Sequence, residues 1–344
     1  MKSERKCSSF SVMNAYRNHD TIHPSKAYAV PQQHTRRQFL KVGAVISCAV
    51  VLGAAARASG KGTALAKREK RVYIMTDMEG VAGVLDSENW CEPEGRYYEL
   101  GKEFLTAEVN AAIAGFARAG ATAFLVADGH GHGGINPKLL DRRAELARNW
   151  APPPYPFSLD KSFGYAACVG QHAMSRTEGA HLAHTGSFGV FETTINGTPV
   201  GEFGEMALCA ARLGVRVIFG SGDLAFTREA QALLPGIETV AVKRGTTPGR
   251  GDECDGDAYA KRNLAAIHSQ PQRAQELISE AAERAIRRAK TDASFGILTL
   301  KPPFERVTML RRQGDQPRRI GRSSHPSDGI ALMNAPIKYE GANE

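Results

Sequence analysis

The sequence lacks closely spaced cysteines. Four cysteines lie beyond residue 58: Cys91, Cys168, Cys209 and Cys254. No two of them form a Cys-x-x-Cys pair. This absence excludes a zinc ribbon or zinc finger. Cys168 and Cys209 stand in apolar segments, so we expect both to be buried as small hydrophobic side chains. One disulfide remains an alternative for an exported chain.

The sequence also lacks phosphate-binding glycine loops and an excess of one charge sign. No Walker or Gly-x-Gly-x-x-Gly loop occurs, so nothing supports nucleotide binding. The formal net charge is +8 from 44 Lys or Arg and 36 Asp or Glu, but nine of the basic and two of the acidic residues lie within residues 1–58. The remaining 35 basic and 34 acidic residues nearly cancel, which gives no support for a nucleic-acid partner.

Residues 1–58 have the pattern of a twin-arginine export signal. The pair Arg36-Arg37 is followed by an apolar run over 42–56 and by the small-x-small cleavage pattern Ala56-Arg57-Ala58. Because the run is short and rich in Gly and Ala, we expect cleavage and no stable membrane association afterwards; an uncleaved anchor is the alternative. The prediction is a periplasmic or secreted protein exported by the twin-arginine machinery.

Apolar runs alternate with amphipathic segments over the rest of the chain. The whole chain is divided into a signal (1–58), a linker (59–70), a main domain (71–300) and a C-terminal extension (301–344), with loop-rich insertions at 135–160 and 245–256. The extension beyond residue 310 is expected to be irregular. Buried strands are predicted at 72–75, 122–127, 165–169, 215–219, 237–242 and 304–310, and helices at 102–118, 201–213 and 271–290.

Two carboxylates follow the first predicted strand. Asp77 and Glu79 are two residues apart, so in extended backbone they face the same side and repel each other unless a cation lies between them. The next strand along the chain ends at Asp128-Gly129-His130-Gly131-His132. Because a strand, a helix and a second strand of this length form a right-handed parallel pair, His130 is expected beside Asp77 and Glu79. The alternative is an ordinary polar turn.

Half of the ten histidines lie between residues 130 and 184. Histidine is the commonest metal ligand among side chains, so this clustering favours a metal site. We prefer His130 over His132 as a ligand. For each histidine, a hydrogen-bonded structural role is the alternative. Glu202 at a predicted helix start has the alternative of stabilising the helix dipole.

Five motifs taken together resemble the zinc-dependent D-aminopeptidases of peptidase family M55, the DppA type. They appear in that family's order and close to its spacing over residues 71–245, but the pattern is not followed through 244–257 or past residue 300. The motifs are Asp77-Met78-Glu79-Gly80, Asp128-Gly129-His130-Gly131, Gly170-Gln171-His172-Ala173, His184-Thr185, and Asn196-Gly197 with Gly201-Glu202.

The resemblance implies two zinc ions per chain bound by five side chains. Asp77 is expected to bridge the ions, Glu79 and His130 to complete one site, and His172 and Glu202 the other. His184 is expected to be the catalytic side chain outside the metal shell. The resemblance also implies a three-layer α/β/α fold around a mainly parallel sheet, and a ring-like homo-oligomer.

The predicted function is hydrolysis of short peptides with an amino-terminal D-residue, such as D-Ala peptides, through a metal-activated water. One alternative is a metal-dependent amidase or esterase that acts on another substrate. The other is a non-catalytic periplasmic protein that binds a metal or a peptide. Full coordination with no open ligand position, or bound zinc without turnover, favours that second alternative.

Overall fold

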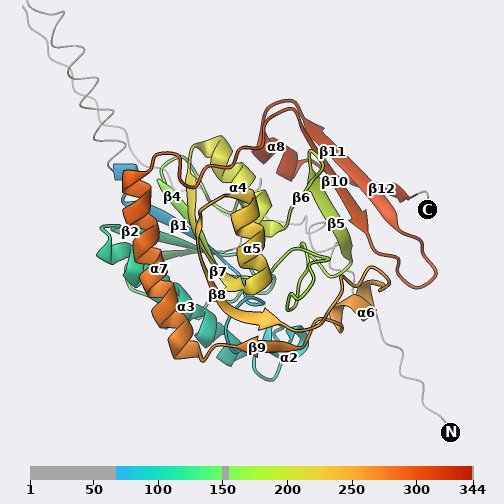
Figure 1. Cartoon of the computed structure of the whole chain (residues 1–344), viewed down its shortest axis with the longest axis horizontal. Coiled ribbons are helices and arrows are strands. Elements are labelled where there is room, and N and C mark those ends of the chain that lie inside the picture. Colours follow the sequence, from blue (N-terminus) through green and yellow to red (C-terminus); the bar gives the residue numbers. More distant parts are fainter. Residues whose placement is uncertain (1–66, 149–154, 343–344) are drawn as a thin grey trace, which may run out of the picture. The chain divides into compact units, whose positions relative to one another are not determined.

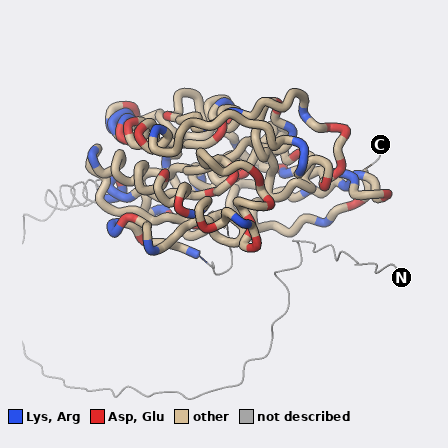
Figure 2. The backbone as a smooth tube through the Cα atoms, turned by 90° about the horizontal axis from the view of Figure 1, so that it is seen from below, with Lys and Arg blue, Asp and Glu red and all other residues tan. Residues whose placement is uncertain are grey.

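A computed structural model describes residues 67–148 and 155–342 of the chain (Figure 1). The predicted export signal at 1–58 lies outside the described residues. Within the described ranges, no helix combines the length and the apolar character needed to cross a membrane. Basic and acidic residues are interspersed along this part of the backbone (Figure 2).

A seven-stranded sheet forms the centre of the described part. Its strands are parallel except β9, which pairs with β8 in the antiparallel direction. The order across the sheet is β3 (Ala144–Ala147), β2 (Ala123–Asp128), β1 (Arg71–Thr76), β4 (Tyr165–Gln171), β7 (Arg216–Asp223), β8 (Glu238–Gly245) and β9 (Ala266–His268).

Helices cover both faces of this sheet. Side chains alternate along β1, so that Val72 and Ile74 are buried against α3 (Tyr98–Arg118) and α7 (Pro271–Thr291). Tyr73 and Met75 are buried on the opposite face with α4 (Glu202–Leu213) and α5 (Leu224–Leu233). The predicted three-layer α/β/α arrangement around a mainly parallel sheet is therefore confirmed (Figure 1).

A second, antiparallel sheet contains the C-terminal residues. Its order is β12 (Lys338–Gly341), β11 (Arg319–His325), β10 (Phe304–Leu310), β5 (Val190–Ile195) and β6 (Thr198–Pro199), and α8 (Gly329–Asn334) precedes β12. The strand predicted at 304–310 is confirmed. The expectation of an irregular chain beyond residue 310 is wrong: β11 has few apolar residues, and its pairing with β10 is a backbone interaction that an apolar pattern does not reveal.

The remaining local predictions agree closely with the structure. Helix α4 is followed by Gly214 as its C-cap. Gly214 has φ +66°, in the left-handed region that glycine tolerates. Four helices were not predicted: α2 (Ser87–Trp90), α5, α6 (Gly256–Ala260) and α8. The four described cysteines are free, and Cys168 and Cys209 are buried as expected.

Gly170, near the end of β4, lets the chain that leaves β1 approach this strand closely. Its φ is +78°, and a Cβ built there would collide with the carbonyl oxygen of Asp77. We expect Gly170→Ala to lower the free energy of unfolding by about 3 kcal/mol or more, because strain and steric overlap act together. Gly197 is the matched control: its φ is +76° and no heavy atom lies within 4 Å of the added Cβ.

Gly197→Ala is expected to cost only about 1 kcal/mol, from backbone strain alone. Urea denaturation of both variants and the wild type measures the difference. Equal losses of stability in the two variants would contradict the close approach between Gly170 and Asp77.

Candidate metal centre

Four of the six predicted site residues follow the ends of three neighbouring parallel strands: Asp77, Glu79, His130 and His172. β1 is paired with β2 on one side and with β4 on the other, and Thr76 is in register with both Asp128 and Val169. Asp77 directly follows β1, and His172 directly follows β4, which continues two residues beyond the level at which β1 ends. The carboxyl ends of parallel strands, where the strand order reverses, are the usual location of ligand sites in such sheets.

Asp77, Glu79 and His130 form the first group of candidate ligands. His130 Nδ1 lies 3.1 Å from Asp77 Oδ1 and 3.2 Å from Glu79 Oε2. All three side chains are buried, and one ligand atom from each lies within 4.8 Å of the other two. The sequence prediction that His130 joins the Asp-x-Glu pair is confirmed in geometry.

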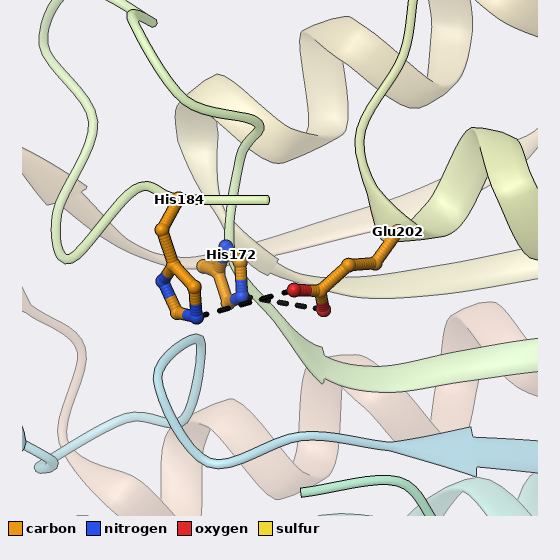
Figure 3. A group of neighbouring side chains, drawn as sticks. All are labelled: His172, His184 and Glu202. Atoms are coloured by element: carbon orange, nitrogen blue, oxygen red, sulfur yellow. Dashed lines mark ion pairs between the residues drawn. The ribbon is translucent and has the colours of Figure 1, made fainter. Parts of the chain in front are cut away.

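His172, Glu202 and His184 form the second group (Figure 3). Glu202, at the start of α4, places Oε2 3.4 Å from His172 Nε2 and Oε1 3.9 Å from His184 Nε2. The two imidazole rings are stacked, with centroids 3.9 Å apart and planes inclined by 17°. The His184 ring therefore lies against the ring of His172.

Asp77 faces both groups. Its Oδ1 lies near His130 as described, and its Oδ2 lies 3.1 Å from His172 Nε2. Gln171, which sequence reasoning did not assign to the site, donates from Nε2 to Asp77 Oδ2 at 3.2 Å and to Glu202 Oε2 at 3.1 Å. Its position beside His172 in the same motif is the signal that could have identified it.

Backbone carbonyls orient the three imidazoles. His130 Nε2 lies 2.8 Å from the Cys91 carbonyl oxygen, and His172 Nδ1 lies 2.9 Å from that of Ala173. His184 Nδ1 lies 2.8 Å from the Leu182 carbonyl oxygen. Because a carbonyl accepts a hydrogen bond from the N–H of one ring nitrogen, the other nitrogen of each ring faces the carboxylates and offers its lone pair when the ring is neutral. This is the usual support of a metal-binding histidine.

The charges of the site fit a cation. Burial lowers the pKa of His130 and of His172, yet the adjacent carboxylates outweigh it and hold both pKa values well above the ordinary range. In the described part of the chain, Glu79 Oε2 and His172 Nε2 are buried close to other candidate ligands, yet neither forms a well-oriented hydrogen bond. Carboxylate oxygens and imidazole nitrogens are ligands that zinc accepts, so these residues fit zinc ions.

His132 lies apart from both groups. It is exposed, and its Nδ1 pairs with Glu92 Oε2 at 3.0 Å. Of the two histidines in the loop after β2, only His130 contacts the carboxylates of Asp77 and Glu79.

Glu229 of α5 was also missed. Its Oε2 accepts from the backbone N–H of Met174 at 2.7 Å, two residues after His172. A Cβ added at Gly201 would lie 2.7 Å from its Oε1, so the carboxylate also lies against the residue before Glu202. Because α5 itself was not predicted, no sequence signal led to this contact.

Comparisons with known proteins identify the family and the fold of the chain. The sequence profile of peptidase family M55, described as D-aminopeptidase, matches residues 70–315. A D-aminopeptidase of Bacillus subtilis (strain 168) is 34% identical over 178 residues, which are 51% of this chain and 64% of that protein, so the match spans less than two thirds of the relative.

A solved structure described as "Zn-dependent D-aminopeptidase DppA from Bacillus subtilis, a self-compartmentalizing protease" has the same fold. Its TM-score is 0.64 at 24% identity, over 77% of this chain and 94% of that chain. The family match also continues through residues 244–257 and past residue 300, beyond the region covered by the five motifs. This chain belongs to peptidase family M55, the family of the D-aminopeptidases.

Proposed function

We propose that this protein is a binuclear zinc-dependent aminopeptidase that hydrolyses short peptides with an amino-terminal D-residue, such as D-Ala peptides. The observation that carries the proposal is the position of Asp77, whose two oxygens face two separate groups of metal-type ligands. Membership of the D-aminopeptidase family supports the substrate class.

In this proposal Asp77 would be shared by the two ions, Glu79 and His130 would hold one, and His172 and Glu202 the other. Zinc held by these residues would supply an activated water and would polarise the scissile carbonyl. The remaining chemistry belongs to the side chains. Gln171 restrains Asp77 and Glu202 through its two hydrogen bonds, so that the carboxylates keep their positions during turnover.

His184 is proposed to move the proton. A metal ion lies about 2.0–2.1 Å from a ligating nitrogen and close to the ring plane, so two nearly parallel stacked rings do not both aim at one ion. This favours His172 as the ligand and His184 as the catalytic side chain. Burial and the neighbouring His172 lower the pKa of His184. Its Nε2 is then free to accept a proton and to pass it to the leaving amine.

The substrate is proposed to enter beside Glu202. The Glu202 side chain is 29% exposed, whereas Asp77 and Glu79 are 9% and 5% exposed. Glu202 is therefore the most accessible of the three candidate ligand carboxylates. A free α-amino group approaching from the open side meets the Glu202 carboxylate before the buried acids, which gives a physical reason for action at the amino end.

We also propose that the protein is exported by the twin-arginine route to the periplasm or beyond, and that it forms a ring-like homo-oligomer. The leader pattern at residues 1–58 supports export. The self-compartmentalizing solved structure supports assembly. Cell fractionation and sedimentation velocity of the purified protein test these two proposals separately.

Metal removal tests the function directly. We expect a chelator to abolish release of D-alanine from D-Ala-D-Ala, and added zinc to restore it. A panel of D- and L-amino-terminal dipeptides, simple amides and esters, assayed with the same preparation, identifies the substrate. Preferred cleavage of an amide or ester would favour the other hydrolase, and stoichiometric zinc without any turnover would favour a binding protein.

A further inference from the structure

In the loop that follows the Asp-x-Glu pair, each backbone N–H from Gly80 to Val84 donates a hydrogen bond. Gly80 N–H donates to the Gly170 carbonyl at 2.7 Å, and Val81 N–H donates to that of Met78 at 3.1 Å. Val84 N–H donates to the Val81 carbonyl at 3.3 Å. A loop needs such partners where it is buried, but backbone partners account for only part of this one.

Four side chains from distant parts of the chain bind the backbone of residues 82–85. We call these four the 82–85 clamp. Glu108 Oε1 accepts from Ala82 N–H at 2.9 Å, and His268 Nδ1 accepts from Gly83 N–H at 3.1 Å. Lys243 Nζ donates to the Val84 carbonyl at 3.2 Å. His181 Nε2 lies 3.1 Å from the Leu85 carbonyl.

The clamp joins the two halves of the metal centre. Residues 82–85 follow Glu79 of the first group, and His181 belongs to the loop that carries His184 of the second. That loop is strained, because Leu182 has φ +56° while it is fully buried. Strained conformations persist where the surrounding structure fixes them, and they concentrate at functional sites.

Lys243 is the least expected member. Its side chain is buried, and no described carboxylate forms an ion pair with it. Burial lowers its pKa to about 8, while nearby Asp223 opposes the decrease. A buried ammonium disfavours folding, so its presence calls for a role other than stability.

We propose that the 82–85 clamp positions Glu79 for metal binding and that Lys243 is its principal positioning residue. This inference rests on the proposed zinc centre but not on the substrate. Lys243 acts through the Val84 carbonyl and the short loop that leads back to Glu79. Loss of this contact lets the loop, and with it the Glu79 carboxylate, leave the position that faces His130.

The variant Lys243→Met separates positioning from stability. Methionine has a similar length but carries neither the charge nor the donor. Losing outer partners of metal ligands typically costs 10- to 100-fold in metal affinity. We expect zinc affinity, measured by competition with a chromophoric chelator, to fall about 10- to 100-fold for at least one ion. The melting temperature of the metal-free protein is expected to stay equal or to rise.

Lys290→Met is the matched control. Lys290 Nζ also donates to a backbone carbonyl, that of Ala119, at 2.6 Å, but this contact lies where α3 and α7 end and does not involve residues 82–85. This variant is expected to bind zinc like the wild type. Wild-type zinc affinity in Lys243→Met would overturn the proposal, whatever its melting temperature.

A second pair of variants decides the question if Lys243→Met does not fold. His268 is partly exposed and lines a shallow surface pocket with Lys243. His268→Ala removes the acceptor for Gly83 N–H, whereas His268→Asn places an oxygen near the former Nδ1. We expect weaker zinc binding in His268→Ala and recovery in His268→Asn. Equal, wild-type affinities in both variants would overturn the clamp.

These measurements also distinguish the clamp from the proposed enzyme. Wild-type protein that binds zinc but cleaves no D-peptide refutes the substrate assignment and leaves the clamp to be judged by zinc affinity. Active wild type with unaltered zinc binding in Lys243→Met and His268→Ala refutes the clamp alone.

Discussion

Asp77→Ala is expected to lose most of the bound zinc and to lower kcat/KM for D-Ala-D-Ala by about 10³-fold or more, roughly 4 kcal/mol of transition-state stabilisation. The reason is that one carboxylate serves both groups: Oδ1 lies 3.1 Å from His130 Nδ1 and Oδ2 lies 3.1 Å from His172 Nε2. Removing it weakens two sites at once. Atomic emission of the purified protein gives zinc per chain, with about two expected in the wild type.

His132→Ala is the control for this experiment. His132 is in the same glycine-rich loop as His130, yet it is exposed and pairs with Glu92. We expect it to keep its zinc and its activity, whereas His130→Ala should lose zinc. An Asp77→Ala protein that retains two zinc ions, or that cleaves the peptide at the wild-type rate, refutes the bridging role.

The convergence of the site could be predicted because parallel strands impose it. A helical crossover connects β1 to β2, so the two strands are parallel and their carboxyl ends share one edge of the sheet. Asp77 and His130 follow those ends, and the structure places them 3.1 Å apart. The roles of the individual ligands came from the family resemblance, because spacing alone does not say which carboxylate faces two partners.

Other parts of the site could not be predicted because their signal is a contact with backbone. Glu108 lies within the amphipathic pattern of α3, and Lys243 follows an apolar run of β8, so each resembles a surface residue. Both are buried and hydrogen-bonded to the loop after Glu79. Periodicity indicates which face of an element is buried, but it does not indicate which polar side chain is buried with it.

The position of His184 could not be predicted from a local sequence pattern either. Its loop has no apolar period, and its path depends on the strained Leu182 and on the contact between Leu182 N–H and the Asn263 carbonyl at 3.1 Å. No local pattern predicts that this loop stacks His184 on His172. Only the family resemblance connected the two residues.

His184→Ala is expected to keep about two zinc ions per chain while kcat falls about 10²- to 10⁴-fold, the range typical for loss of a general acid–base group. KM should change much less, because the carboxylate that we propose meets the substrate amine is unaltered. The physical reason is the ring geometry: His172 and His184 are stacked at 3.9 Å, and Nδ1 of His184 is bound to the Leu182 carbonyl. Steady-state kinetics and metal analysis of the same preparation measure both quantities.

Phe188→Leu is the matched control, because the Phe188 ring lies 4.5 Å from that of His184 and contributes packing but no ionisable group. A loss of kcat below about tenfold is expected for it, since the His184 nitrogens remain. If His184→Ala instead binds about one zinc ion per chain, His184 is a ligand of the second ion, and proton transfer must be assigned to another group. The stacked rings argue against that result, because a single ion does not lie in both of their planes.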